Sequence, residues 1–258
     1  MTTTVTTSLA KTVLITGAGS GFGKGAALVL AGRGHTVIAA VQDEEQRTAL
    51  ATEAPALSVV VLDVTDAAHL DRLDGLQPDV LIANAAVGQT GPLSLIPLEL
   101  VRRAFEVNVF GTLAVVQRVA AGMRTRRSGR ILIVSSIAGV RAGAGSGPYS
   151  MTKHALQAMG GVLRNELAPF GVDVALINPG PYATGFNDRM ADHPGDWFDE
   201  ATAAPEDVAI MASLRERITV GQLDPAEVVQ RYVELVEAER TEAVNFVPPD
   251  ILERLARR

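Results

Sequence analysis

Residues 12–23 read TVLITGAGSGFG, a short apolar run that passes directly into a glycine-rich turn. Residues 12–16 have the apolar, β-branched composition of a buried strand, and residues from Gly21 onwards have helical length and spacing. Glycines at 17, 21 and 23 allow a tight turn, close approach of the backbone to a pyrophosphate, and a helix N-terminus aimed at that anion. The stretch therefore predicts the strand–turn–helix unit that opens a dinucleotide-binding sheet.

The spacing of this turn excludes a P-loop. The motif G-x-x-x-x-G-K ending at Lys24 would need glycine where Ala18 stands, and Gly25 replaces the Ser or Thr that would hold Mg²⁺. A glycine-rich turn by itself is a weak signal, because glycine also simply ends strands. Its position between an apolar strand and a helix is what favours dinucleotide binding.

The rest of the chain repeats the alternation of short apolar runs with longer amphipathic segments. Strands are expected at residues 12–16, 36–41, 58–62, 80–83, 130–135, 172–177 and 243–247. Helical segments between them include residues 21–33, 98–126 and 149–168. Continuous apolar strands separated by helices imply a parallel sheet covered on both faces. Since no repeat or linker divides residues 1–258, a single domain is expected.

The composition is that of a soluble globular protein. A hydrophobic content of 47% with 20% charged residues allows a sizeable core. The net charge of −6, without a dense basic run, argues against nucleic acid and anionic membranes as partners. The chain has no cysteine and its four histidines lack metal-ligand spacing, so no metal is expected. The N-terminus shows neither a signal peptide nor a membrane span, which makes the cytoplasm the expected compartment.

Residues 136–153, SIAGVRAGAGSGPYSMTK, contain a candidate acid–base centre. Tyr149 and Lys153 are four residues apart and would share one face of a helix. A lysine cation beside a phenol favours the phenolate, so the pKa of Tyr149 is expected to fall from its usual value of about 10 towards neutrality. Ser136 follows an apolar run, at the mouth of a predicted strand, and the three side chains can converge on one oxygen atom. Alone, Y-x-x-x-K is weak, because Tyr and Lys at helical spacing are usually surface residues.

Polar residues at other strand ends are candidates for cofactor contacts. Gln42 and Asp43 stand where a carboxylate would bind the ribose of NAD, or an arginine the 2′-phosphate of NADP. The acidic run that starts at Asp43 slightly favours NAD, although acids also suit the first turn of a helix. Asp63 either accepts a hydrogen bond from the adenine amino group or caps the next segment. Asn84 either tolerates a turn conformation or props the strand ends beside the cofactor.

Asn108 lies within a predicted helix, in FEVNVFG, where asparagine has poor helical propensity. Asn108 is either a tolerated polar position or the site of a helix kink. At such a kink a backbone carbonyl would hold a water molecule that leads to Lys153. Further on, residues 182–220 are expected to form a substrate lid. Its aromatic residues either favour an apolar or ring-bearing substrate or form a satellite core under a long loop; they are Phe186, Trp197 and Phe198. Two polar residues of the same segment, Arg189 and His193, could select an acidic substrate.

The glycine turn, Asn108, Ser136, Tyr149-x-x-x-Lys153 and Asn178-Pro179-Gly180 stand in one order over most of the chain. Together they resemble the short-chain dehydrogenase/reductase family. The resemblance implies a Rossmann-type, doubly wound, mainly parallel seven-stranded sheet with helices on both faces. It also implies an NAD(P)-dependent oxidoreductase that interconverts a secondary alcohol and a ketone by hydride transfer.

The resemblance implies a role for each of these residues. Tyr149 would be the catalytic acid/base and Ser136 would position the substrate oxygen. Lys153 would bind the nicotinamide ribose and depress the pKa of Tyr149, and Asn108 would complete a water-linked proton relay. The cofactor would be bound by Gly17, Gly19, Ser20, Gly21, Phe22, Gly23, Gln42, Asp63, Val64, Asn84, Ala85, Tyr149, Lys153, Pro179, Gly180 and Thr184.

The resemblance also implies a homodimer or homotetramer built on the helices at 98–126 and 149–168. Two features depart from the family pattern. The family's N-N-A-G is Ala83-Asn84-Ala85-Ala86 here. The C-terminal AVNFVPPDILERLARR lacks the glycine-rich ending of many tetrameric members and looks closer to the hydroxysteroid and retinol dehydrogenase branches.

Two other functions remain as alternatives. Residues 150–153 match the S-x-x-K motif of penicillin-binding acyl transferases, but the chain lacks S-D-N and K-T-G. A non-catalytic dinucleotide-sensing protein on the same fold would be expected to have a broken Ser–Tyr–Lys set. Here the set is intact.

Overall fold

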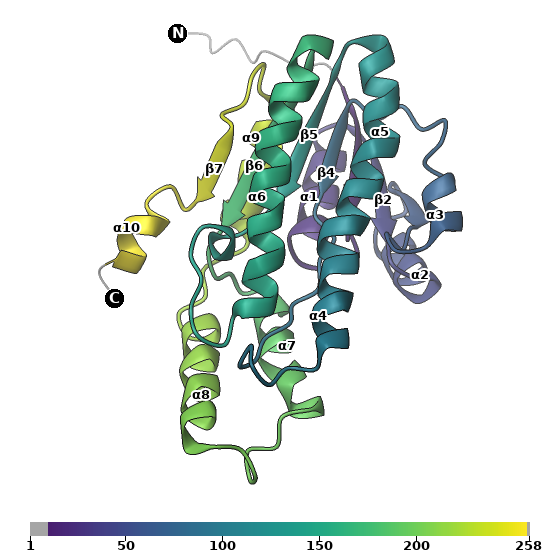
Figure 1. Cartoon of the computed structure of the whole chain (residues 1–258). Coiled ribbons are helices and arrows are strands. Elements are labelled where there is room, and N and C mark those ends of the chain that lie inside the picture. The colour runs from purple at the N-terminus through teal and green to yellow at the C-terminus, as the bar shows by residue number, and fades with distance from the viewer. Residues whose placement is uncertain (1–9, 257–258) are drawn as a thin grey trace, which may run out of the picture.

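In the computed structural model, which describes residues 10–256, seven strands form one sheet in the order β3–β2–β1–β4–β5–β6–β7 (Figure 1). Every neighbouring pair is parallel. The strands are β1 (Thr12–Thr16), β2 (Thr36–Val41), β3 (Ser58–Val61), β4 (Val80–Ala83), β5 (Gly129–Val134), β6 (Val172–Pro179) and β7 (Val244–Val247). The predicted Rossmann-type fold is confirmed.

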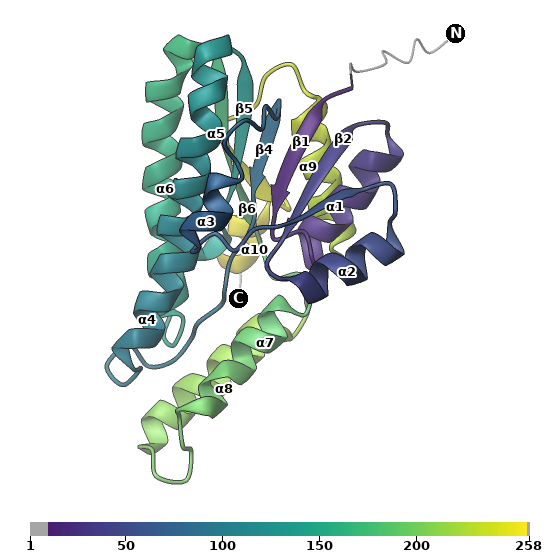
Figure 2. The ribbon, with the colours of Figure 1, turned by 90° about the vertical axis from the view of Figure 1, so that its right-hand side faces the viewer.

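Helices cover both faces of the sheet because its strands are apolar on both sides. On one face lie α1 (Gly21–Gly32), α2 (Glu44–Glu53) and α9 (Ala226–Glu237). The other carries α3 (Ala67–Asp71), α5 (Thr112–Arg126) and α6 (Gly147–Leu167), and α4 (Leu98–Phe105) lies beside α6 on the same side (Figure 2). Figure 2 shows the sheet between α1 and α9 on one side and α5 and α6 on the other. Along β1, Val13 and Ile15 pack into the α1–α9 core, whereas Leu14 packs into the opposite core.

The topology creates a crevice at the carboxyl ends of the strands. The chain leaves β3 at the edge of the sheet and returns to β4, which pairs with β1 on the side away from β2. The segments that follow β1 and β4 therefore diverge, and such a reversal of strand order is where doubly wound sheets bind their ligands. Helices α7 (Phe186–Asp192) and α8 (Pro205–Thr219) extend beyond this end of the sheet (Figure 1).

The helix predicted at 98–126 is wrong in one respect, because it is not a continuous α-helix. Between α4 and α5 the chain forms a π-helical segment, Glu106–Gly111, which contains Asn108. Such a segment inserts extra backbone into a helix and is common at functional sites. The other predicted ends coincide with the observed ones or differ by at most two residues, as for β6, which runs on to Pro179.

The sequence predicted neither a signal peptide nor a membrane span. The N-terminal stretch 1–9, where no signal peptide was predicted, lies outside the described residues. None of the helices formed by residues 10–256 is long and apolar enough to span a membrane. The short helix α10 (Ile251–Ala256) ends the described chain.

Candidate active site

A cavity of about 1410 Å³ opens at the carboxyl ends of the strands, from the glycine turn to α7 and α8. Every residue to which the family resemblance gives a catalytic or cofactor-binding role lines it, except Gly23 and Asn108. The cavity is thus formed by segments far apart in the chain: the turns after the strands, the first turns of α6, and α7. Its position at the carboxyl ends of the strands is that of a small-molecule site in an α/β sheet.

The glycine turn after β1 has backbone conformations that favour glycine. Gly17 and Gly21 have φ angles of 66° and 52°, in the left-handed region. At Gly23, a Cβ atom would lie 2.4 Å from the carbonyl oxygen of Gly17, so this glycine lets α1 pack directly against the turn. Ser20 precedes α1, and its side chain makes no capping hydrogen bond. The turn and the first N–H groups of α1 therefore offer an anion a place to bind, as a dinucleotide requires.

Asn84 holds the end of β4 against the end of β1. Its Nδ2 atom donates to the carbonyl oxygens of Thr16 and Gly17, at 3.0 and 3.2 Å. Its Oδ1 atom accepts from the hydroxyl of Tyr232 at 3.1 Å. Asn84 therefore props the strand ends, the second of the two alternatives that the sequence allowed.

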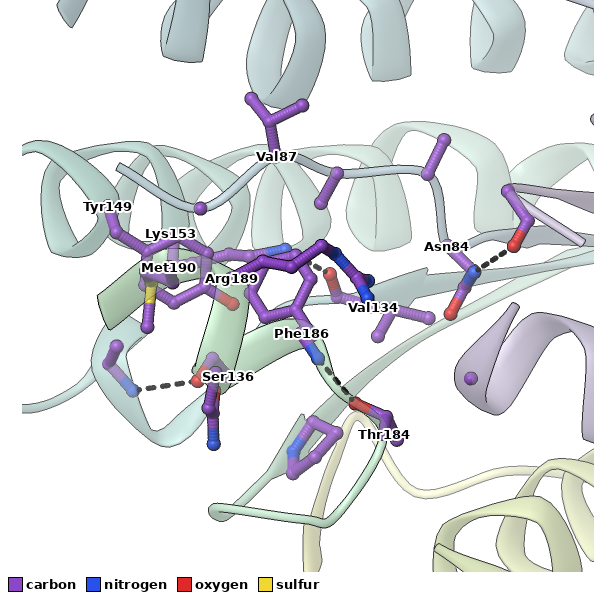
Figure 3. Close-up of a pocket in the computed structure, with 18 of the residues that line it drawn as sticks. Asn84, Val87, Val134, Ser136, Tyr149, Lys153, Thr184, Phe186, Arg189 and Met190 are labelled. Carbon is purple, nitrogen blue, oxygen red and sulfur yellow. Dashed lines mark hydrogen bonds between the residues drawn. The ribbon is translucent and has the colours of Figure 1, made fainter. Parts of the chain in front are cut away.

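The predicted acid–base residues come together at the middle of the cavity (Figure 3). Tyr149 and Lys153 lie one turn apart on α6, and Ser136 follows β5. The Tyr149 hydroxyl is hydrogen-bonded with the Ser136 side chain. The Lys153 Nζ atom lies 5.5 Å from the centroid of the Tyr149 ring and donates to the carbonyl oxygen of Val134 at 2.9 Å. This arrangement can hold an oxygen atom between two hydroxyl groups, beside a cation.

Burial decides the protonation of this pair. It raises the pKa of the Tyr149 phenol well above its usual value, and the hydrogen bond with Ser136 only partly opposes that rise. Burial also lowers the pKa of Lys153 to about 7, because the ammonium loses its hydration. The expected fall in the pKa of Tyr149 is therefore wrong for this state of the protein. At neutral pH part of the Lys153 population is uncharged, and only the protonated amine favours the phenolate.

Asn108 is fully buried and acts on the loop after β4. Its Oδ1 atom accepts from the Val87 backbone N–H at 2.8 Å, and its Nδ2 atom donates to the Val87 carbonyl at 2.9 Å. Nδ2 also donates to Thr152 Oγ1 at 3.1 Å. Asn108 thus fixes the Val87 loop against α6, which explains why its side chain does not line the cavity. The water relay through its backbone carbonyl stays a prediction.

Gln46, which the sequence analysis missed, lies at the edge of the cavity near Gly19 and Gln42. Asp43 caps α2 by accepting from the Gln46 backbone N–H at 2.8 Å. The Gln46 side chain accepts from the Gln42 backbone N–H at 3.3 Å, and its Oε1 atom lies 2.4 Å from where a Cβ on Gly19 would stand. The signal was present in the sequence, because glutamine three residues after an N-cap is typical of a capping box.

Asp63 lines the cavity and is tied to the segment that follows it. Its Oδ1 atom accepts from the backbone N–H and the hydroxyl of Thr65, at 2.9 and 2.7 Å. Burial raises the pKa of Asp63, but these hydrogen bonds, together with one from the Gln42 side chain and the field of His69, outweigh it, and the pKa lies below the usual value. Asp63 is therefore held as a carboxylate, and it organises the turn after β3.

The lid aromatics divide into two groups. Phe186 lines the cavity, and its ring centroid is 5.7 Å from that of Tyr149. Trp197 instead packs on Gly91, where a Cβ would lie 2.4 Å from its ring, and its ring contacts that of Phe198. Phe186 therefore has the position that the substrate-contact alternative requires, and the contact itself stays a prediction, whereas Trp197 and Phe198 match the satellite-core alternative.

Gln157 is a second residue that the sequence analysis missed. Its Nε2 atom donates to Ser135 Oγ at 3.0 Å and to Asn178 Oδ1 at 2.7 Å. Ser135 Oγ in turn donates to the carbonyl oxygen of Lys153 at 3.0 Å. Gln157 thus ties α6 to β6 and to the end of β5, directly behind the acid–base pair. The signal was the recurrence of polar residues on one helical face at 149, 153 and 157.

The parallel sheet, the glycine turn and the buried Ser–Tyr–Lys set together define a Rossmann-fold protein of the oxidoreductase class. Residues 11–195 match the family model described as short chain dehydrogenase. This span is more than half of the 258 residues, so the chain belongs to the short-chain dehydrogenase family.

Relatives and solved structures agree with this assignment. Retinol dehydrogenase 8 of Homo sapiens is 33% identical over 247 residues, which are 89% of this chain and 79% of the relative. A short-chain dehydrogenase from Streptomyces avermitilis has a TM-score of 0.82 at 28% identity, covering 96% of this chain and 92% of that one. A short-chain dehydrogenase/reductase from Burkholderia phymatum, in complex with NAD, has a TM-score of 0.80 at 26% identity with the same coverage of 96% and 92%. The family resemblance expected from the sequence is confirmed.

Proposed function

We propose that this protein is an NAD(P)-dependent oxidoreductase that interconverts a secondary alcohol and a ketone, with Tyr149 as the acid/base. The observation that carries the proposal is the position of the Tyr149 and Ser136 hydroxyl groups. They lie together on the wall of a cavity that also contains the glycine turn. A dinucleotide bound at the turn can therefore reach the same space as the substrate oxygen.

The residues at this place divide the chemistry among them. A nicotinamide ring supplies hydride transfer when it is bound. In oxidation Tyr149 takes the proton of the substrate hydroxyl, and in reduction it returns one to the forming alkoxide. Ser136 donates a second hydrogen bond to the same oxygen. Lys153 uses one hydrogen on Val134, so its remaining hydrogens are available to ribose hydroxyl groups, and in its charged form it favours the Tyr149 phenolate.

The proposal favours NAD over NADP slightly. Asp43 stands at the end of β2 beside Gln42, and its carboxylate opposes the dianionic 2′-phosphate of NADP. Gln46 extends over Gly19 at the same edge of the cavity and narrows the space there. Titration of the protein with both dinucleotides tests this preference. A lower dissociation constant for NADP would overturn it.

An apolar or ring-bearing substrate suits the other end of the cavity. Phe186 and Met190 of α7 line it together with Val87, Ile137 and Ala138. Human retinol dehydrogenase 8 is named for an apolar, ring-bearing alcohol, which supports the same substrate class. We further propose that residues 1–258 form one domain in which residues 182–220 cover the substrate.

Self-association into a homodimer or homotetramer belongs to the same proposal. Phe110, in the π-helical segment between α4 and α5, and Val162 on α6 are each 54% exposed. These are the helices on which the family resemblance places subunit contacts. The molar mass in solution tests this part of the proposal, and a monomer at micromolar concentration would contradict it.

The main experiment is a screen of alcohols and ketones against NAD(H) and NADP(H), followed by nicotinamide absorbance. It should include steroids, cyclic ketones and apolar primary alcohols. Tyr149→Phe should lower kcat by about 10²- to 10⁴-fold while dinucleotide binding is retained. Near-normal turnover by that variant would refute the role of Tyr149. Dinucleotide binding without turnover of any substrate would favour a non-catalytic dinucleotide sensor.

A further inference from the structure

Arg189 is an arginine of α7 that lines the cavity, and its side chain has no partner in the part of the chain that the structure describes. Among residues 10–256, no carboxylate or carbonyl group accepts a hydrogen bond from its guanidinium, and only its backbone is bonded: its N–H donates to Gly185 and its carbonyl accepts from His193. The two arginines of α8 that lie nearby are engaged: Arg215 pairs with Asp192 at 2.7 Å, and Arg217 donates to the carbonyl of Ala144 at 2.8 Å. Arg189 therefore keeps its guanidinium available for a ligand.

The position of this guanidinium relates it to the glycine turn. Its Nη1 atom lies 3.0 Å from where a Cβ on Gly185 would stand. The preceding residue, Thr184, lies against the turn, since its Cβ is 3.2 Å from where a Cβ on Gly21 would stand. In Figure 3 the Arg189 side chain extends across the pocket, away from Tyr149 and towards the side where Asn84 lies. Arg189 thus approaches the turn region from the lid.

The glycine turn offers N–H groups to an anion but has little side-chain charge of its own. The only cationic residue of the stretch 16–24 is Lys24, and its Nζ atom is bound to Glu53 at 2.6 Å. Lys153 is buried at the other end and donates to Val134. A guanidinium is suited to a phosphate group, because it presents several N–H donors in one plane.

We propose that Arg189 binds the pyrophosphate of the dinucleotide from the lid side, opposite the N–H groups of the glycine turn. The inference rests on the proposed function, because it assumes that a dinucleotide binds in this cavity. It adds a consequence for the lid: α7 gains a charged contact only when the cofactor is bound. Cofactor binding thereby orders the segment that carries Phe186 and Met190, and so shapes the substrate end of the cavity.

The competing role for Arg189 is recognition of an acidic group on the substrate. The two roles predict different ligands to be affected, which binding measurements can separate without turnover. ADP-ribose keeps the pyrophosphate and lacks the nicotinamide, and adenosine lacks both. These ligands together with NAD⁺ locate the contact along the cofactor.

The experiment measures dissociation constants by calorimetry for the wild type, Arg189→Gln and Arg189→Lys. Arg189→Gln should weaken NAD⁺ and ADP-ribose alike, by about tenfold, as expected for loss of a hydrogen bond between charged groups. Arg189→Lys should restore part of the affinity, and adenosine should bind all three proteins equally. The salt dependence of NAD⁺ binding should also be shallower in Arg189→Gln.

Arg141→Gln is the matched control, because it removes one positive charge from the same cavity lining, from the segment after the 3₁₀ turn Ile137–Gly139. It should bind NAD⁺ as the wild type does. Arg189 is exposed, so its variants should keep the wild-type melting temperature.

The outcomes separate this inference from the proposed function. Unchanged NAD⁺ and ADP-ribose affinities in Arg189→Gln would overturn the inference while leaving the dinucleotide site intact. A loss for NAD⁺ but not for ADP-ribose would overturn it too, since the contact would then lie at the nicotinamide. A loss of equal size in Arg141→Gln would reduce the effect to general electrostatics and would overturn it as well. Failure of the wild type to bind any dinucleotide would instead refute the proposed function.

Discussion

Lys153 donates its ammonium hydrogen to the carbonyl oxygen of Val134, the last residue of β5, at 2.9 Å. Ser136 stands two residues after that carbonyl, and Tyr149 lies one turn before Lys153 on α6. One hydrogen bond therefore fixes the helix that carries the phenol relative to the strand end that carries the serine. Since Lys153 and Tyr149 are both buried, desolvation decides their protonation.

The first prediction concerns the pH dependence of stability. Burial lowers the pKa of Lys153 from 10.5 to about 7, so between these values the unfolded chain binds a proton that the folded chain does not. The free energy of unfolding therefore rises with pH across this window. Relative to Lys153→Met, the wild type should gain about 2–3 kcal/mol between about pH 6 and pH 9, because the variant lacks the titrating group.

Urea unfolding of both proteins at several pH values checks this prediction. The measurements should stay below pH 10, because above that pH the raised pKa of Tyr149 has the opposite effect. There the unfolded chain loses its phenol proton before the folded chain does, and the free energy of unfolding falls as pH rises. If the stability curves of the two proteins run parallel from pH 6 to 9, Lys153 does not change its charge on folding.

The second prediction concerns Asn108 and the Val87 loop. Asn108→Asp replaces the Nδ2 donor by an acceptor, so the Val87 carbonyl and Thr152 Oγ1 lose their donor inside the protein. The variant should lose about 3 kcal/mol or more of unfolding free energy, because unpaired polar groups and a new carboxyl group remain buried. Chemical denaturation of the wild type and the variant measures this loss of unfolding free energy. Thr152→Val removes the Thr152 hydroxyl, which accepts from Asn108 and donates to the Tyr149 carbonyl at 2.8 Å, but it keeps both bonds between Asn108 and Val87 and buries no new carboxyl group, so it should cost less. Equal costs would contradict the assigned roles.

The structure of this region also shows where prediction from sequence ends. The strands could be predicted to within one or two residues, because parallel strands covered on both faces are continuous apolar runs. The π-helical segment could not, since Asn108 in that segment bonds to Val87, which lies 21 residues away in the chain. The poor helical propensity of asparagine indicated that position 108 is unusual, but it did not predict that the Asn108 side chain bonds to Val87.

The candidate site was predictable in part for the same reason. Spacing alone placed Tyr149 and Lys153 on one helical face, and the glycine pattern located the turn. The pKa of Tyr149 depends instead on how completely the folded chain covers it, which no local pattern encodes. The sequence likewise allowed Trp197 and Phe198 either to contact substrate or to form a satellite core. The packing of Trp197 on Gly91, and of Phe198 on Trp197, favours the satellite core.

The third prediction compares two glycines of α1. A Cβ on Gly23 would lie 2.4 Å from the Gly17 carbonyl oxygen, a backbone atom that cannot move aside without distorting the turn. Gly23→Ala should therefore lower both the melting temperature and the affinity for dinucleotides. At Gly32 a Cβ would meet nothing within 4 Å, so Gly32→Ala should leave binding unchanged and stabilise the protein by about 0.5–1 kcal/mol. Thermal unfolding and dinucleotide titration of both variants test the contrast. Equal melting temperatures and equal dinucleotide affinities in the two variants would show that the glycine turn can shift to accommodate a Cβ atom at position 23.

The last prediction concerns the carboxamide behind the acid–base pair. Gln157→Leu has a similar size but removes the donor shared by Ser135 Oγ and Asn178 Oδ1. Ser135 keeps its bond to the Lys153 carbonyl, whereas Asn178 is fully buried and would keep no partner within residues 10–256 for either side-chain atom, because its Nδ2 atom already has none there. The variant should lose about 1–3 kcal/mol of unfolding free energy.

The matched control is Asn165→Leu, which replaces an exposed carboxamide of the same helix and should change stability by about 0.5 kcal/mol or less. Urea unfolding at one pH compares the two variants. A small effect of Gln157→Leu would mean that Asn178 finds another donor when the glutamine is removed, and that α6 is held to β6 by apolar packing and by the bonds of Arg164 to Asp173 and Val174. A cost within the expected range, beside a neutral Asn165→Leu, would establish that the hydrogen bonds of Gln157 help to hold α6 to β6, in addition to those of Arg164.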